Sequence, residues 1–123
     1  MPVKRILLID DNAELLDAIT EEFSSEGYEV HASAERAEVE ALLSHFEYDL
    51  VITDLALPRC GFGGFDLLES IARRCIRPRV IVLTNHGGPA VEAEGCSRGA
   101  ETFLKKPAAL SDLVRLIGMM VEA

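Results

Sequence analysis

The residues of this chain that could do chemistry stand at the ends of its apolar runs. In chain order they are Asp10, Asp11, Asp54, Thr84 and Lys106. Three carboxylates that share one crevice repel one another, and hard oxygen ligands with open positions suit Mg²⁺. A lysine and a threonine hydroxyl beside them could bind the oxygens of a transferring phosphoryl group. The set therefore predicts phosphoryl chemistry next to a divalent ion.

Asp54 has two interpretations. Aspartate is a poor strand residue and is common in turns, so the run VITDLALP, taken alone, also fits a simple turn after a strand. The other residues have plain explanations too, since Asp10-Asp11-Asn12 can cap the helix that follows, Thr84 can fill a strand and Lys106 can be solvated. Together they favour a nucleophile, because a carboxylate is ionised at neutral pH and can form an aspartyl phosphate.

Apolar runs alternate with helical patterns along the whole chain. The runs predict strands at residues 5–9, 50–53, 79–83 and 102–104, and a weaker one at 28–32. Helical spacing of apolar residues predicts helices near 15–23, with Gly27 as the stop signal, and at 34–46, 65–74, 89–98 and 110–121. The short connections require right-handed crossovers onto a parallel sheet that is covered on both faces. The sequence predicts a doubly wound α/β fold, with its functional crevice at the carboxyl ends of the strands.

The composition limits the class of protein. A chain of 123 residues fits one domain with its own core. Its formal net charge of -9 opposes attraction to nucleic acids and anionic membranes, so neither is expected as a direct partner. The sequence has no apolar run of membrane-spanning length and no recognisable signal peptide, which predicts a cytoplasmic protein. The widely spaced Cys60, Cys75 and Cys96 support neither a disulfide framework nor a zinc site.

The motifs resemble those of a known family over essentially the whole chain. They are LLIDDN, VITDLALP, VIVLT and GAETFLKKP, and intervals of 44, 30 and 22 residues separate Asp10, Asp54, Thr84 and Lys106 as in the family. The chain is similar to the receiver domain of two-component response regulators. The resemblance implies a single domain over residues 1–123, with a flavodoxin-like five-stranded parallel sheet of order 2-1-3-4-5 and five helices.

The resemblance also implies a role for each site residue. Asp54 would accept a phosphoryl group from a phosphohistidine on a histidine kinase or a histidine phosphotransfer protein, and the domain would catalyse its own phosphorylation and dephosphorylation. Lys106 would supply a cation for the phosphoryl oxygens, while its neighbour Lys105 would be solvated. Mg²⁺ would be bound by Asp11 directly, by Asp10 through water, by Asp54 and by the backbone carbonyl of Ala56.

A conformational switch is implied as well. Thr84 would move toward the phosphoryl group while the ring of Phe103 turns inward, and Ala56 and His86 would tune how fast the acyl phosphate is hydrolysed. The change would reshape the surface formed by residues 89–98, 102–104 and 110–121. A downstream protein, or a second copy of the chain in a homodimer, would bind there.

Some features depart from the family pattern or leave alternatives open. The loop RCGFGG is two residues longer than usual, and Asn85 and Ala108 are atypical. His31 and His45 have no ligand spacing and are expected at the surface. The alternative function is a receiver-like interaction scaffold that acts without phosphorylation, which the complete residue set opposes. The chain ends with its last predicted helix, so no output domain is expected in these residues, and an origin in a larger signalling protein stays open.

Overall fold

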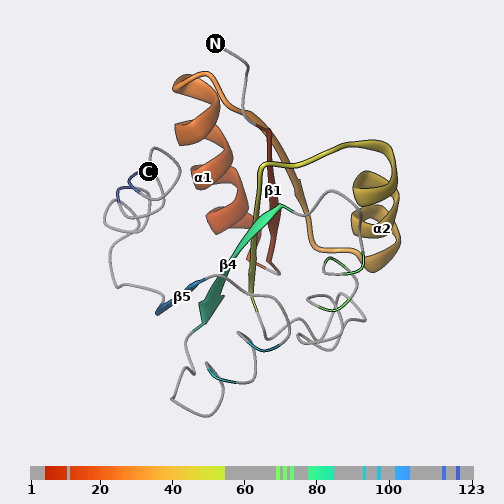
Figure 1. The fold of residues 1–123 in the computed structure, drawn as a ribbon. Helices are drawn as coiled ribbons and strands as arrows, with labels where there is room; N and C mark the ends of the chain where they lie inside the picture. Colours follow the sequence, from red (N-terminus) through yellow and green to blue (C-terminus); the bar gives the residue numbers. More distant parts are fainter. Residues whose placement is uncertain are drawn as a thin grey trace.

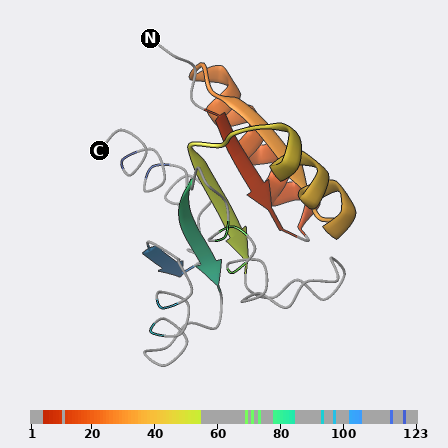
Figure 2. The same cartoon turned by 45° about the vertical axis from the view of Figure 1, so that its right-hand side comes forward.

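The computed structural model describes residues 5–10, 12–54, 78–84 and 102–105, and the single positions 69, 71, 73, 93, 97, 115 and 119. Of Arg36, Asp54, Thr84 and residues 102–105 it describes the backbone alone. The strands form one parallel sheet in the order β2-β1-β3-β4-β5. They are β1 (Arg5–Ile9), β2 (Glu29–Ser33), β3 (Leu50–Asp54), β4 (Arg79–Thr84) and β5 (Thr102–Lys105). Figure 2 shows the arrowheads of β1, β3 and β4 pointing toward the same edge.

Helices α1 (Ala13–Ser25) and α2 (Arg36–His45) follow β1 and β2 and lie on opposite faces of the sheet (Figure 1). The parallel α/β architecture predicted from the sequence is therefore confirmed. The predicted helices at 65–74, 89–98 and 110–121 lie outside the continuous described ranges. Among the residues that the structure describes, no helix is long and apolar enough to cross a membrane.

Successive residues of the central strands point to alternate faces, so the sheet has two cores. On one face Ile19 and Phe23 of α1 pack on a set that includes Ile6, Leu8, Leu50, Ile52, Ile81 and Leu83. On the other face Val39 and Leu43 of α2 pack on a set that includes Leu7, Ile9, Val51, Val80 and Val82. Strands buried on both faces read as continuous apolar runs, and this explains why the sequence pattern located them.

The strand boundaries differ slightly from the predicted ones. The first strand matches, whereas β3, β4 and β5 each extend one residue beyond the predicted end, and β2 is shifted by one. The extra residues include Asp54 and Thr84. Their polar side chains end the apolar pattern, but their backbones still pair with the adjacent strand, Asp54 with Leu83 and Thr84 with Lys105. The two residues expected just beyond β3 and β4 are thus the last residues of those strands.

The end of α1 is fixed by Gly27, as the sequence predicted. Its φ of 97° lies in the region that favours glycine, and its N–H donates to the carbonyl of Ser24 over 3.1 Å. The N–H of Tyr28 donates to the carbonyl of Phe23, also over 3.1 Å, which completes a Schellman motif. The rings of Phe23 and Tyr28 meet edge to face with centroids 5.7 Å apart. This contact turns the chain from the helix into β2.

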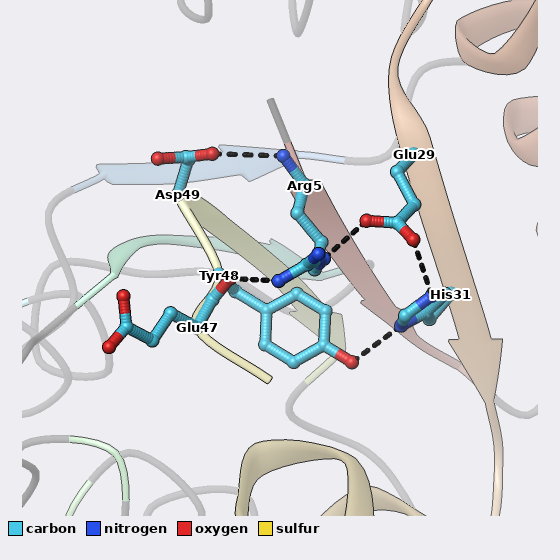
Figure 3. A network of polar contacts seen from close by, with 6 residues as sticks. All are labelled: Arg5, Glu29, His31, Glu47, Tyr48 and Asp49. Carbon is cyan, nitrogen blue, oxygen red and sulfur yellow. Dashed lines mark hydrogen bonds and ion pairs between the residues drawn. The ribbon is translucent and has the colours of Figure 1, made fainter. Parts of the chain in front are cut away.

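Arg5 ties together the amino ends of β1, β2 and β3 (Figure 3). Its guanidinium pairs with the carboxylate of Glu29 and donates to the carbonyl of Glu47 over 3.2 Å. Its backbone N–H donates to the carboxylate of Asp49 over 2.9 Å. The guanidinium carbon also lies 4.9 Å from the ring centre of Phe46. One side chain thus joins three segments that are far apart in the sequence.

His31 extends this network along β2 (Figure 3). Its Nδ1 lies 2.7 Å from the hydroxyl of Tyr48, and its Nε2 lies 3.6 Å from Glu29. The ring of Phe46 meets the imidazole edge to face at 4.7 Å between centroids. His31 was expected at the surface but is half-buried, because these residues from the loop after α2 cover it. His45 is exposed, as expected.

Candidate functional site at the carboxyl ends of the strands

The strand register brings the predicted site positions to one edge of the sheet. Ile9 of β1 pairs with Thr53 of β3, so the next residues, Asp10 directly after β1 and Asp54 at the end of β3, come at neighbouring positions of the sheet edge. Asp54 in turn pairs with Leu83, and the residue after Leu83 is Thr84. Neighbouring strands lie about 4.8 Å apart, so the backbones of Asp10, Asp54 and Thr84 are close together.

The fifth strand continues the same edge. Thr84 pairs with Lys105, the last residue of β5, and Lys106 is the next residue of the chain. Phe103 pairs with Val82 two residues before that edge. The backbone of β5 thus brings Phe103 and Lys105 alongside β4, the strand that ends in Thr84.

Asp10 is the site residue whose side chain the structure describes. It is only 5% exposed, although it follows directly after the last residue of β1. Its N–H donates to the carbonyl of Ser33 at the end of β2 over 3.4 Å, and its Oδ1 accepts from the N–H of Asn12 over 2.9 Å. A carboxylate held at the sheet edge by backbone contacts supplies the hard oxygen that Mg²⁺ prefers, so the described part of the site fits that ion.

Other predicted site residues lie outside the described ranges. These are Asp11, Ala56, His86 and Lys106. The three cysteines, the RCGFGG loop, Asn85 and Ala108 lie outside them too. Their roles stay predictions, as do the side-chain roles of Asp54, Thr84 and Phe103.

Two neighbours of Asp10 were not singled out as site residues from the sequence. Ser33 is 4% exposed, and its Oγ accepts from the N–H of Glu35 over 3.1 Å, which shapes the turn into α2. Asn12 is the N-cap residue of α1, and its Oδ1 accepts from the N–H of Leu15 over 3.2 Å. The sequence signal for Asn12 was available, because asparagine is among the preferred capping residues. The contact of Ser33 with Asp10 depends on strand pairing and has no local signal.

Comparison with known proteins places this arrangement in a family. The sequence pattern of the response regulator receiver domain matches residues 6–118. The chain belongs to this family. The sequence motifs of this chain had implied the same family, with carboxylates where β1 and β3 end.

Relatives of this receiver domain include larger regulators. It is 32% identical over 118 residues to the DNA-binding transcriptional regulator NtrC of Bradyrhizobium sp. (strain RP501 Parasponia), covering 96% of this chain and 24% of that protein. It is 34% identical over 117 residues to the transcriptional regulatory protein QseB of Escherichia coli O157:H7, covering 94% of this chain and 52% of that one. The receiver domain therefore spans about half or less of the length of these relatives.

Solved structures agree with the fold. A CheY-like response regulator receiver domain protein from Methanospirillum hungatei JF-1 superposes with a TM-score of 0.84 at 27% identity, covering 98% of this chain and 95% of that one. The chemotaxis response regulator CheY4 of Vibrio cholerae gives a TM-score of 0.84 at 22% identity, covering 96% of this chain and 98% of that one. At the latter identity the likeness concerns the fold alone.

Proposed function

We propose that this receiver domain is a phosphoacceptor in a two-component phosphorelay, with Asp54 as the residue that becomes phosphorylated. The observation that carries the proposal is the register that sets Asp54, the last residue of β3, beside Asp10 after β1. Membership of the receiver family supports the same role. In this proposal residues 1–123 form one domain, in which five helices accompany the five-stranded sheet.

The phosphoryl donor is a phosphohistidine of a histidine kinase or histidine phosphotransfer protein. A carboxylate oxygen of Asp54 attacks phosphorus, an O–P bond forms, and the P–N bond to the donor imidazole breaks with its electron pair remaining on nitrogen. The main obstacle is repulsion between the attacking carboxylate and the phosphoryl oxygens. Lys106 and the hydroxyl of Thr84 are proposed to offset it by binding those oxygens. The receiver domain in this way catalyses its own phosphorylation.

The residues that would hold Mg²⁺ are Asp10, Asp11, Asp54 and the backbone carbonyl of Ala56. The buried carboxylate of Asp10 at the strand end supports this set, because carboxylate and carbonyl oxygens are ligands of the required type. When bound, the ion supplies positive charge that offsets the crowded carboxylates and the phosphoryl oxygens.

The phosphorylated state is proposed to switch the surface formed by residues 89–98, 102–105 and 110–121. Thr84 moves toward the phosphoryl group and the ring of Phe103 takes the space that it leaves. Ala56 and His86 control how fast water removes the phosphoryl group, a step that the domain also catalyses itself. The switched surface then binds a downstream protein target or a second copy of the chain.

The output is proposed to pass through protein contacts in the cytoplasm. The relatives include a protein described as DNA-binding, but this chain covers 24% of it, and a formal net charge of -9 works against direct contact of these residues with nucleic acid or an anionic membrane.

Phosphorylation can be tested by incubating the chain with acetyl phosphate and Mg²⁺ and recording the intact mass. The wild type and Asp17→Asn, which changes an exposed carboxylate on α1, should both gain one phosphoryl group, whereas Asp54→Asn should gain none. If the wild type also gains none while remaining folded, the alternative of an interaction scaffold without phosphorylation is favoured. Uptake by Asp54→Asn at the wild-type level would move the acceptor to another residue.

A further inference from the structure

Asn12 connects the buried acid of the candidate site to helix α1 by two separate atoms. Its backbone N–H donates to Oδ1 of Asp10 over 2.9 Å. Its side-chain Oδ1 accepts from the N–H of Leu15 over 3.2 Å, and its backbone carbonyl accepts from the N–H of Leu16 over 3.1 Å. The same residue therefore ends the turn that holds Asp10 and begins the helix.

Asn12 is tied to the first turn of α1. Asn12 has φ of -87° and ψ of 103°, the extended conformation of a capping residue, and its cap hydrogen bond restrains it relative to the first turn of α1. That helix is anchored in the core through Ile19 and Phe23, which are 2% and 0% exposed. The N–H that Asp10 accepts is consequently held by a helix that is packed on the sheet.

We propose that Asn12 is a positioning residue for the Mg²⁺ site, which it serves by fixing the orientation of the Asp10 carboxylate. This inference depends on the proposed function, because it concerns the ion that the receiver domain is expected to bind. A hydrogen bond to a carboxylate restricts its rotation, and losing the orienting partner of a direct metal ligand weakens metal affinity by about 10- to 100-fold. For Asp10, which is expected to act through water, this range is an upper bound. The backbone N–H of Asn12 survives a side-chain substitution, so the expected loss is smaller.

The competing explanation is that Asn12 merely stabilises α1. Both explanations predict a less stable protein when the side chain is removed, so stability alone cannot separate them. Gly27 at the opposite end of α1 provides a matched control. Alanine there meets no atom within 4 Å but has to adopt a φ of 97°, so Gly27→Ala weakens the same helix far along the chain from Asp10.

The experiment is a Mg²⁺ titration without any phosphodonor. Binding is measured from the changes in backbone amide chemical shifts in ¹H–¹⁵N NMR spectra. Asn12→Ala should raise the Mg²⁺ dissociation constant by about threefold to tenfold, below the range for loss of the whole orienting bond. Asn12→Ser, which can still cap the helix, should restore most of the affinity. Gly27→Ala should bind Mg²⁺ like the wild type. Equal dissociation constants for Asn12→Ala and the wild type overturn the proposal, and an equal weakening in Gly27→Ala overturns it in favour of the stability explanation.

Amide hydrogen exchange supplies a second readout that needs no ion. In Asn12→Ala the N–H groups of Leu15 and residue 12 should both exchange faster, by about fivefold, the factor that a typical cap contributes. If only Leu15 is affected, the cap does not restrain the bond to Asp10 and the proposal fails. Asn12→Gly replaces Asn12→Ala as the test variant if Asn12→Ala does not fold. Glycine also lacks the side-chain oxygen that accepts from Leu15, but it destabilises the helix less than alanine does at this position. A wild type that shows no specific Mg²⁺ binding would instead count against the proposed function.

Discussion

The hydroxyl of Tyr48 lies 2.7 Å from Nδ1 of His31, which joins the loop after α2 to the edge strand β2 (Figure 3). Tyr48 is 5% exposed, and burial raises its pKa to about 12, so the hydroxyl keeps its proton in this contact. Because β2 pairs with β1 alone in the sheet order, such side-chain contacts help to hold it in place.

Tyr48→Phe should therefore lower the free energy of unfolding by about 1 kcal/mol, the usual net contribution of one hydrogen bond. Urea denaturation of the wild type, Tyr48→Phe, His31→Ala and the double variant measures it as a double-mutant cycle. The two substitutions should couple, since each removes the same contact. Strictly additive losses would show that the contact does not contribute to stability.

Glu29 should make stability depend on acidity. The hydrogen bond from Arg5 is the main cause that lowers the pKa of Glu29 below its ordinary value of 4.5, so the folded state prefers the ionised form. The stabilisation is present above that value and is lost as the pH falls through the lower pKa of the folded state. Glu29→Gln should be less stable than the wild type at neutral pH, and the difference should disappear in acid.

This prediction can be checked by urea denaturation at several values between about pH 7 and about pH 3. Glu38→Gln, which alters an exposed carboxylate on α2, is the control and should show a smaller pH-dependent difference. The assignment to the pair with Arg5 fails if Glu29→Gln and the wild type lose stability in parallel on acidification.

Gly27→Ala should lower the free energy of unfolding by about 1 to 2 kcal/mol, because an L side chain at positive φ is strained even where space is open. Gly27→Asn should cost less, since asparagine tolerates positive φ better than alanine. Thermal and urea unfolding of the two variants give the comparison. An alanine variant as stable as the asparagine variant would mean that the backbone relaxes to a different turn.

The fold was predictable where the signal is local or periodic. Gly27 ends α1 because its conformational freedom is a property of one residue, and β1, β3 and β4 were located because both of their faces are buried. The place of Asp54 beside Asp10 followed from the general rule for the carboxyl ends of parallel strands. No comparable general rule fixes the arrangement of side chains around Asp54, so that arrangement stays a prediction.

Contacts between distant residues were not predictable. The environment of His31 depends on Tyr48, 17 residues away, and that of Arg5 depends on Glu29, 24 residues away. Nothing in the spacing of these residues indicates that a loop would fold over the edge strand. The buried position of Ser33 beside Asp10 escaped for the same reason, since a serine at the end of a strand is usually an unremarkable turn residue.

Lys106→Met should slow phosphorylation of Asp54 by acetyl phosphate about a hundredfold, the scale for losing one group that stabilises transition-state charge. The cation is proposed to bind phosphoryl oxygens rather than Mg²⁺, so the affinity for Mg²⁺ should not fall. Initial rates of phosphoryl uptake by intact mass, together with a Mg²⁺ titration of the unphosphorylated variant, measure both quantities.

Lys105→Met is the matched control, because it removes the same charge one residue earlier in the chain. The resemblance to the receiver family assigns the cation of the site to Lys106 and leaves Lys105 solvated, so Lys105→Met should be phosphorylated at close to the wild-type rate. Equal slowing in the two variants would indicate a general effect of positive charge on an acidic domain. A large loss confined to Lys105→Met would assign the cation of the site to Lys105.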